Sequence, residues 1–363
     1  MGNVPNLRFP EFSGEWEKTR LGDNCNIQMC KRIMAVQTNT DGGVPFYKIG
    51  TIGGKADAYI SKDLFDEYKA KYSFPHKGEV MITCAGTVGK CIIYNGEDSY
   101  YQDSNIVWID NPKEIISNDF LYHLLSKINW SHLNSTTIVR IYNDDLRNLK
   151  LYYPIHDEQK KITNFLSLIN KRIATQNKII EKLQSLIKGL AVALTTKKKA
   201  NIAISQCLEC HSSTLQESVV LSSGLCKVFG ANGLVGYKDV PQMNGDAILV
   251  IKDGSGVGTV FYAQGKFSVI GTLNYLTVIG NNDLRYLYFA LSVFNFQPYK
   301  TGMAIPHIYF KDYGKAKIYC PSLAEQKRVA NVLDKLESKL FVEQELLASF
   351  NQQKLYLLGK MFI

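Results

Sequence analysis

The chain has 363 residues, of which 45% are hydrophobic, and its formal net charge is +9 at pH 7. This length and composition predict two or three folded domains with real cores, and they exclude a disordered chain. The sequence has no run of 18 apolar residues, so no membrane span is expected, and the positive charge favours an anionic partner without identifying it.

The first residues, 1–18, contain no apolar stretch of the kind found in a signal peptide. We therefore expect a cytoplasmic protein whose eight cysteines are reduced thiols. Cys207, Cys210 and His211 match the haem c attachment pattern, and a zinc site is the other alternative. Haem attachment needs export and zinc needs a second close pair, so scattered thiols are the favoured interpretation and no metal is expected.

Short strands followed by glycine turns occur in two parts of the chain. Residues 78–86 (GEVMITCAG) and 245–256 (GDAILVIKDGSG) both show this pattern. Residues 120–126 and 286–292 each predict one short helix. The two parts are therefore expected to be mixed α+β domains that are rich in strands and turns.

The segment 142–162 is repeated 167 residues later at 309–329. The two segments share eight identities: Tyr142/Tyr309, Asp145/Asp312, Lys150/Lys317, Tyr152/Tyr319, Pro154/Pro321, Glu158/Glu325, Gln159/Gln326 and Lys160/Lys327. Chance would give roughly one or two identities at ordinary residue usage. A repeat with so long a period indicates a duplicated domain rather than a solenoid.

Each repeated segment leads into a long stretch with residues at alternating spacings of four and three, which is a heptad pattern typical of helices packed along a seam. The seam residues are Ile162, Leu166, Ile169, Ile173, Gln176, Ile180, Leu183 and Ile187 in the first stretch, and Val329, Leu333, Leu336, Leu340, Glu343 and Leu347 in the second. Gln176 and Glu343 stand at equivalent positions. They are either a buried polar pair that fixes the register, which is the favoured reading, or solvated residues at a frayed seam.

The order domain, helix, domain, helix predicts the architecture. We expect an α+β protein in which two β-rich domains lie at opposite ends of an antiparallel two-helix coiled coil, with a pseudo-twofold internal repeat. The predicted boundaries are 1–154 and 200–321 for the domains, and 155–199 and 322–363 for the spacer helices. The first helix would be about 58 Å long at 1.5 Å per residue, which exceeds one turn of duplex DNA, roughly 34–36 Å.

These features resemble the specificity (HsdS-type) subunits of type I restriction-modification systems over nearly the whole chain. The motifs that carry the resemblance are the opening residues 5–12 and 15–23, the stretches 228–236 and 302–314, and the Pro-x-x-x-Glu-Gln helix openings at 154–159 and 321–326. The chain departs from the pattern at Ile155, where the second copy has Ser322, and at Val139, where the second copy has Pro306.

The resemblance implies two target-recognition domains, each reading one half of a split, asymmetric double-stranded DNA sequence. It also implies helices that space the two halves and dock two adenine-methylating modification subunits, which restriction subunits with ATP-driven motors join. S-adenosylmethionine, ATP and Mg²⁺ would be held by those partner subunits, and this chain would hold no cofactor of its own.

The residues themselves point to a binding and scaffolding subunit rather than an enzyme. The only Asn-Pro pair, at Asn111, is not followed by the residues of an adenine methylation motif. Gly86–Cys91 resembles the end of a phosphate-binding loop, but Cys84 stands where a glycine is required and Cys91 where a serine or threonine is required. No catalytic residues are therefore predicted.

Residues that could contact DNA are small, polar or basic and lie in or near the glycine turns. The candidates are Thr83, Thr87, Gly89, Lys90, Gln102, Ser104, Asn105 and Arg140 in the first domain, and Lys252, Ser255, Gly256, Thr272, Asn274 and His307 in the second. Arg140 and His307 end the paired loops 135–140 and 301–307. Each candidate could instead serve only the fold. A coiled-coil scaffold that binds only proteins, or a specificity subunit of a related methyltransferase-nuclease system, remains an alternative.

Overall fold

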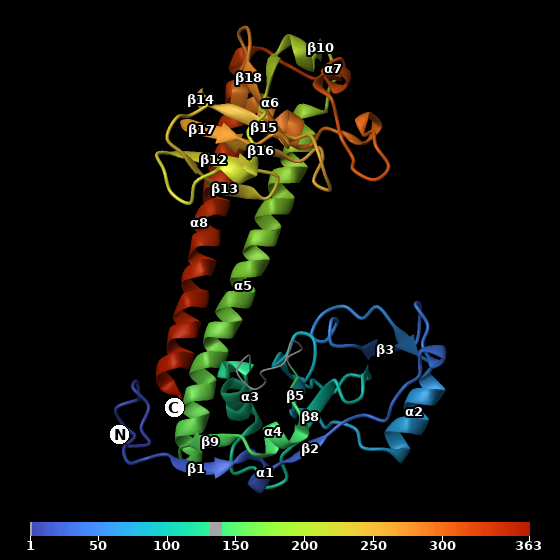
Figure 1. Cartoon of the computed structure of the whole chain (residues 1–363), viewed down its shortest axis with the longest axis vertical. Coiled ribbons are helices and arrows are strands. Elements are labelled where there is room, and N and C mark those ends of the chain that lie inside the picture. Colours follow the sequence, from blue (N-terminus) through green and yellow to red (C-terminus); the bar gives the residue numbers. More distant parts are fainter. Residues whose placement is uncertain (1, 131–139) are drawn as a thin grey trace. The chain divides into compact units, whose positions relative to one another are not determined.

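The computed structural model describes residues 2–130 and 140–363 and divides into two compact units (Figure 1). Unit 1 comprises the chain up to Ala174 together with Ala348–Ile363, and unit 2 comprises Thr175–Leu347. Two long helices, α5 (His156–Thr195) and α8 (Leu323–Met361), contribute residues to both units.

Unit 1 is built on a four-stranded sheet of order β2-β8-β5-β6, a three-stranded sheet of order β4-β3-β7 and the pair β1-β9. The strands are β1 (Glu17–Arg20), β2 (Asn26–Gln28), β3 (Val44–Tyr47), β4 (Tyr59–Ile60), β5 (Val80–Thr83), β6 (Cys91–Ile93), β7 (Tyr100–Tyr101), β8 (Ile106–Asp110) and β9 (Lys150–Tyr153). The short helices are α1 (Leu21–Asn24), α2 (Lys62–Lys71), α3 (Asn118–Lys127) and α4 (Asn143–Arg147).

Unit 2 is built on sheets of order β11-β18-β15-β16 and β13-β12-β17-β14 and the pair β10-β19. Its strands are β10 (Ile202–Ala203), β11 (Leu208–Ser212), β12 (Cys226–Gly230), β13 (Gly233–Lys238), β14 (Met243–Asn244), β15 (Ala247–Ile251), β16 (Val260–Ala263), β17 (Lys266–Val269), β18 (Leu273–Val278) and β19 (Lys317–Ile318). Its short helices are α6 (Leu284–Ser292) and α7 (Phe310–Tyr313).

The two units share one topology. Each four-stranded sheet is antiparallel and follows the same sequence of crossovers, with α3 packed against it in unit 1 and α6 in unit 2. Each second sheet contains one parallel pair, β3 with β7 in unit 1 and β12 with β17 in unit 2. The predicted α+β class and the internal repeat are therefore confirmed.

Each repeated segment contains a buried glutamine that makes the same two hydrogen bonds in both units. The side chain of Gln159 donates to the Pro154 carbonyl at 2.9 Å and accepts from the backbone N–H of Ser117 at 2.8 Å. Gln326 makes the same two bonds in unit 2, at 2.9 and 2.8 Å, to Pro321 and Asp283. In each unit the glutamine thus ties the start of a long helix to the residue that caps α3 or α6, Ser117 and Asp283 respectively.

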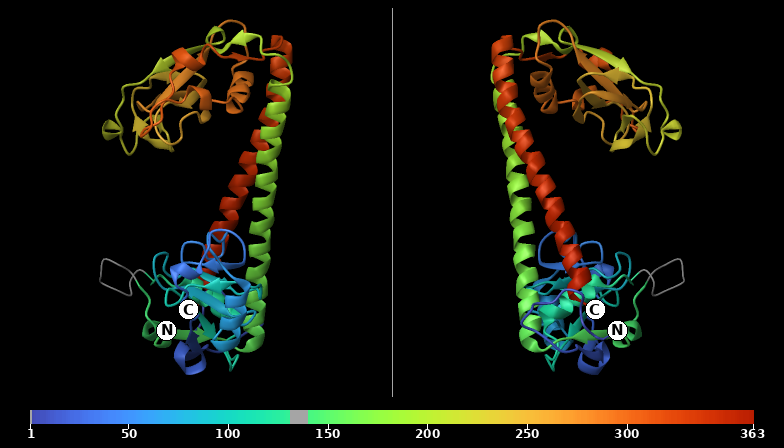
Figure 2. Two further views of the ribbon diagram at one scale, coloured as in Figure 1. Left: turned by 90° about the vertical axis from the view of Figure 1, so that its right-hand side faces the viewer. Right: turned by 90° about the vertical axis from the view of Figure 1, so that its left-hand side faces the viewer.

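Within each unit α5 and α8 pack side by side and run in opposite directions (Figures 1 and 2). In unit 1, Ile162 and Leu166 near the start of α5 share a core with Leu357 and Met361 near the end of α8. In unit 2, Ala191 near the end of α5 shares a core with residues near the start of α8, Val329 and Leu333. Every predicted seam residue is buried or half-buried.

The two polar residues of the seam contact each other directly inside unit 2. The side-chain amide of Gln176 donates to the backbone carbonyl of Glu343 at 3.0 Å and also to its carboxylate. Both residues are buried. The reading of these two residues as a buried pair is confirmed. In the described part of the chain, no helix has both the length and the apolar character needed to cross a membrane.

Candidate nucleic-acid interface

In unit 1 the turn after β5 forms a tight loop that leads into β6. The hydroxyl of Thr83 accepts a hydrogen bond from the backbone N–H of Lys90 at 3.0 Å and donates to the carbonyl of Thr87. Gly89 has a φ of +82°, and a Cβ there would lie 2.0 Å from the ring of Trp130. Thr83 and Gly89 therefore shape the loop, whereas Thr87 and Lys90 are exposed.

The turn before β8 packs against this loop. The backbone N–H of Cys84 donates to the carbonyl of Asn105 at 2.7 Å, and that of Ile141 donates to the carbonyl of Cys84 at 2.9 Å. The guanidinium of Arg140 donates to the carbonyl of Ser104 at 3.2 Å. The structure thus brings three predicted residues together, and two of them, Ser104 and Arg140, line a cavity of about 340 Å³.

Gln102 and Lys90 connect this site to a neighbouring glycine-rich loop. The backbone N–H of Gln102 donates to the carbonyl of Tyr47 at 2.9 Å, and its Oε1 is buried without a hydrogen-bond partner in the described part of the chain. The Nζ of Lys90 donates to the carbonyl of Ile52 at 2.5 Å, which places the loop 48–55 beside it.

Lys48 and Lys55 belong to that loop and are not among the residues that the sequence predicts for the site. The sequence pattern that could have identified them is a pair of lysines around a glycine-rich stretch, KIGTIGGK, because such a stretch suits contact with phosphates. Lys48 forms an ion pair with Asp57 at 2.9 Å.

The equivalent loop of unit 2 follows β15. The backbone N–H of Lys252 donates to the carbonyl of Thr272 at 2.9 Å, and that of Ile308 donates to the carbonyl of Lys252 at 3.0 Å. These bonds repeat those made around Cys84 in unit 1, so Lys252 occupies the position of Cys84. Arg140 precedes Ile141 and His307 precedes Ile308, so these two predicted residues are equivalent as well.

Lys252 lies in a small charged cluster in unit 2. The carboxylate of Asp253 is 2.5 Å from the Nζ of Lys252 and 3.7 Å from the Nδ1 of His307. The backbones of Thr301 and His307 exchange two hydrogen bonds, at 2.9 and 2.8 Å, which close the loop between them. Asp253 is not among the predicted residues, because its contact with His307 joins distant parts of the sequence.

The other predicted residues of unit 2 differ in exposure. Ser255 is exposed and Gly256 is half-buried. Asn274 is only 4% exposed and accepts a hydrogen bond from the Ser212 hydroxyl at 3.0 Å, so it supports the sheet. The hydroxyl of Thr272 is buried without a partner among the residues that the structure describes. Of the loop predicted at residues 135–140, the part 135–139 lies outside the described residues.

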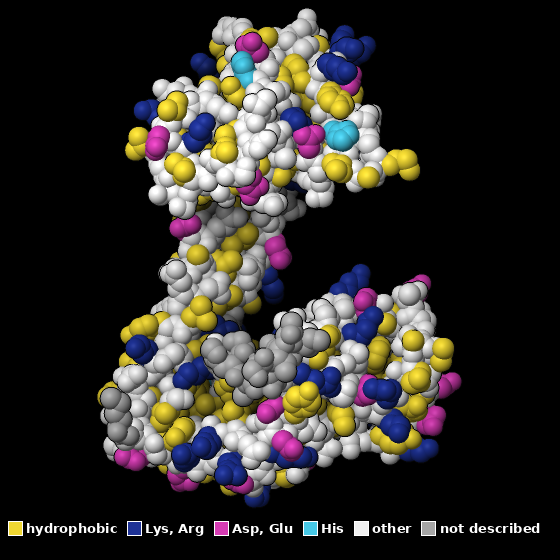
Figure 3. Space-filling view, in the orientation of Figure 1, with side chains coloured by type: hydrophobic (Ala, Val, Ile, Leu, Met, Phe, Trp, Pro, Cys, Tyr) yellow, Lys and Arg dark blue, Asp and Glu magenta, His cyan; other side chains and the backbone are white. Residues whose placement is uncertain are grey.

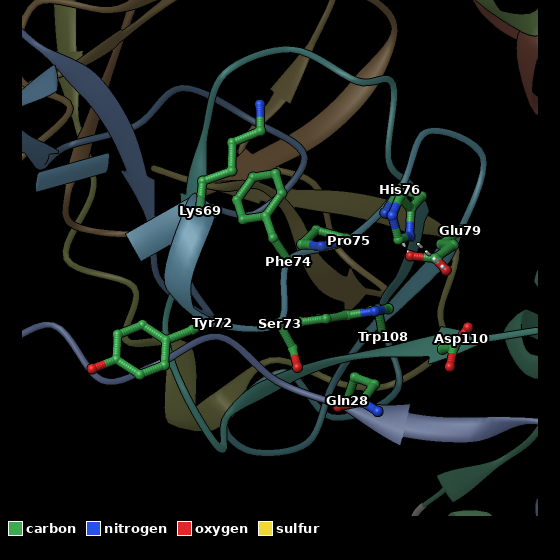
Figure 4. Close-up of a pocket in the computed structure, with 10 residues that line it drawn as sticks. All are labelled: Gln28, Lys69, Tyr72, Ser73, Phe74, Pro75, His76, Glu79, Trp108 and Asp110. Carbon is green, nitrogen blue, oxygen red and sulfur yellow. Dashed lines mark hydrogen bonds and ion pairs between the residues drawn. The ribbon is translucent and has the colours of Figure 1, made fainter. Parts of the chain in front are cut away.

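A separate cavity of about 440 Å³ opens in unit 1 between α2 and the four-stranded sheet (Figure 4). Its lining includes Trp108, Asp110 and Glu79, and His76 faces Glu79 at 3.6 Å. Burial raises the pKa of Glu79. None of the residues predicted to contact DNA lines this cavity.

The cysteine cluster of the sequence lies in and next to β11. Cys207 is buried in the core of unit 2, and the ring nitrogen Nε2 of His211 lies 2.9 Å from the Thr277 hydroxyl. Within residues 2–130 and 140–363, no group of three or more His, Cys, Asp or Glu side chains is placed to hold a metal ion.

On the face of unit 1 drawn in Figure 3, Lys and Arg side chains alternate with Asp and Glu rather than forming one continuous patch. Arg32 shows this mixture next to the site, since it pairs with Asp103 at 2.8 Å. On this face, charge alone therefore does not mark a binding surface for DNA.

Comparison with known proteins gives a family for both halves of the chain. The model of the type I restriction modification DNA specificity domain matches residues 13–185 and again residues 213–352. A Haemophilus influenzae protein named as a type I restriction enzyme specificity subunit is 47% identical over 179 residues, covering 49% of this chain and 44% of that protein. The type I restriction enzyme MjaVIII specificity subunit of Methanocaldococcus jannaschii is 28% identical over 197 residues, covering 53% and 44%. This chain thus spans less than half of either relative.

Solved structures share the fold. The S subunit of a type I restriction-modification system from M. genitalium matches 99% of this chain and 99% of its own, with a TM-score of 0.65 at 17% identity. A structure of a type I restriction-modification system, described by its complex assembly and conformational transition, matches 96% and 97% with a TM-score of 0.56 at 15% identity.

Proposed function

This chain belongs to the family of type I restriction-modification specificity subunits, and we propose that units 1 and 2 each read one half of a split duplex DNA target. The observation that carries the proposal is the twinned loop after β5 and β15. In both units backbone hydrogen bonds hold this loop against the turn before the next central strand. Because this framework is made of backbone atoms, the side chains at the matched positions can differ between the units.

Those side chains do differ between the units. Unit 1 has Cys84, which is buried in its core, and the half-buried Arg140 where unit 2 has the half-buried Lys252 and His307. Base edges are distinguished by their donors and acceptors, so Arg140 in unit 1 and His307 in unit 2 would select different bases at matched positions. The two halves of the target are therefore expected to differ in sequence.

The long helices would dock modification subunits through their exposed apolar side chains, some of which are visible in Figure 3. Leu168, Ile179 and Leu186 lie on one side of α5 at spacings of 11 and 7, and all three are exposed. Phe341 and Val342 are exposed on α8. Exposed apolar surface of this kind is typical of protein interfaces.

The chain would itself be non-catalytic and hold no cofactor. S-adenosylmethionine, ATP and Mg²⁺ would be bound by the modification and restriction subunits with which it assembles. Because its target is genomic DNA, we expect it to act in the cytoplasm.

The test is adenine methylation across the source genome, mapped by single-molecule sequencing with this reading frame intact and deleted. Loss of one split methylated motif on deletion is the expected result. An unchanged methylome, together with purified complexes that bind partner proteins but not duplex DNA, would overturn the proposal in favour of a scaffold that binds only proteins.

A further inference from the structure

We infer that Lys252 is a guanine-reading side chain of unit 2, held in position by Asp253 and His307. The half of the target read by unit 2 would then contain a guanine at this contact. This inference rests on the proposed function and adds to it the identity of a base and the residue that selects it.

Lys252 has donors available for a ligand. An ammonium group carries three N–H donors. In the described part of the chain, the ammonium of Lys252 contacts the carboxylate of Asp253 at 2.5 Å, and its side chain is 26% exposed. Two N–H groups are therefore left to meet a second group from solvent.

The direction of those donors is set by the structure around Asp253. The next residue, Gly254, donates its backbone N–H to the carbonyl of Pro306 at 2.9 Å, and His307 lies 3.7 Å from the Asp253 carboxylate. A Cβ on Gly302 would lie 2.8 Å from the Nε2 of His307, so the ring fits closely into its own loop. A lysine held in this way loses less entropy on binding than a free surface lysine does.

The chemistry of the cluster favours a base edge over a phosphate. Guanine presents two neighbouring acceptors, N7 and O6, in the major groove, whereas adenine replaces the second acceptor with an amino donor that would face the ammonium. A phosphate carries a full negative charge and would lie beside the Asp253 carboxylate, where like charges repel. A neutral guanine edge meets no such repulsion.

Unit 1 has no such cluster at the matched position. Cys84 stands in the place of Lys252, and Ala85 follows it where Asp253 stands in unit 2. The guanine contact is therefore expected in one half of the target alone.

The test uses the complex of this chain with its modification subunits and the split target found by methylation mapping. Competition binding would compare the target with variants carrying each other base at each position of both halves. Lys252→Met is expected to lower the preference for one guanine by roughly 10- to 100-fold and to leave the other half unchanged. Lys252→Arg should restore the preference, because arginine also reads guanine.

Two further variants separate a specific role from a general one. Lys266→Met removes the same charge from the far end of β17 and should leave the preference intact. Asp253→Asn should weaken selection at the same guanine, whereas a merely structural role would weaken binding to every sequence alike.

Other outcomes would overturn the inference. If Lys252→Met weakens binding to all sequences equally and lowers the salt dependence by about one counterion, Lys252 contacts a phosphate. An unchanged preference would also overturn it. If the wild-type complex shows no split motif at all, the proposed function fails, which is a distinct result.

Discussion

At the scale of single residues, Gly89 is required for two physical reasons. Its φ of +82° is unfavourable for other residues, and a Cβ would lie 2.0 Å from Trp130. We predict that Gly89→Ala destabilises unit 1 by about 3 kcal/mol, which combines backbone strain with a steric clash. Gly78→Ala is the control, because its φ is +95° with open space around it, and it should cost about 1 kcal/mol.

Denaturant unfolding followed by intrinsic fluorescence would measure both changes in unit 1. All three tryptophans of the chain, Trp16, Trp108 and Trp130, belong to that unit. Equal losses for the two glycine variants would contradict the role given to the contact with Trp130.

His123 makes the stability of unit 1 depend on pH. Burial, with a smaller effect of Lys354, lowers the pKa of His123 to about 4. An unfolded histidine titrates near 6.5, so between these values the unfolded chain binds more protons and acidification favours unfolding. This contribution to stability is complete above pH 6.5 and decreases by up to about 3 kcal/mol as the pH falls to 4. His123→Leu should reduce the loss of stability between pH 7 and pH 5 in the same fluorescence assay, and an equal loss in both proteins would refute this account.

At the scale of elements, the buried pair in the helix seam is expected to set register rather than to add stability. Gln176→Leu removes the amide donor from the Glu343 carboxylate, which keeps its ion pair with Lys339, and we expect the thermal midpoint of unfolding to fall by roughly 5 °C. The double variant Gln176→Leu, Glu343→Leu should recover at least the wild-type midpoint, because an apolar pair packs without a desolvated charge. A double variant less stable than the single one would show instead that the polar pair is a net source of stability.

The helices and the repeat could be predicted from the sequence because their signals are local or periodic. The heptad spacing placed Gln176 and Glu343 together, and the identities at Gln159 and Gln326 marked equivalent positions. Contacts between distant segments were not predictable in this way. The Asp253–His307 contact and the burial of Thr83 and Asn274 depend on how the loops pack, and a polar residue in or near a turn gives no sign of this in the sequence.

At the scale of the whole molecule, the two reading sites are expected to act independently, because they lie in separate compact units. Arg140→Ala should alter selection in one half of the target, and Lys252→Met should alter it in the other half. The two losses of binding free energy should add within about 0.5 kcal/mol in the double variant. Competition binding of the assembled complex measures this, and a larger deviation would indicate that the units are coupled on DNA.

The twinned loops also bear on how such a protein changes over generations. Their framework consists of bonds between backbone atoms, from Cys84 and Ile141 in unit 1 and from Lys252 and Ile308 in unit 2. The side chains of Arg140, Lys252 and His307 do not make those bonds and are half-buried, so single substitutions there can alter recognition while the fold is kept. Cys84 differs from them, because it is buried in the core of unit 1. A lineage can therefore acquire a new half-target by point mutation, one half at a time, without passing through an unfolded protein.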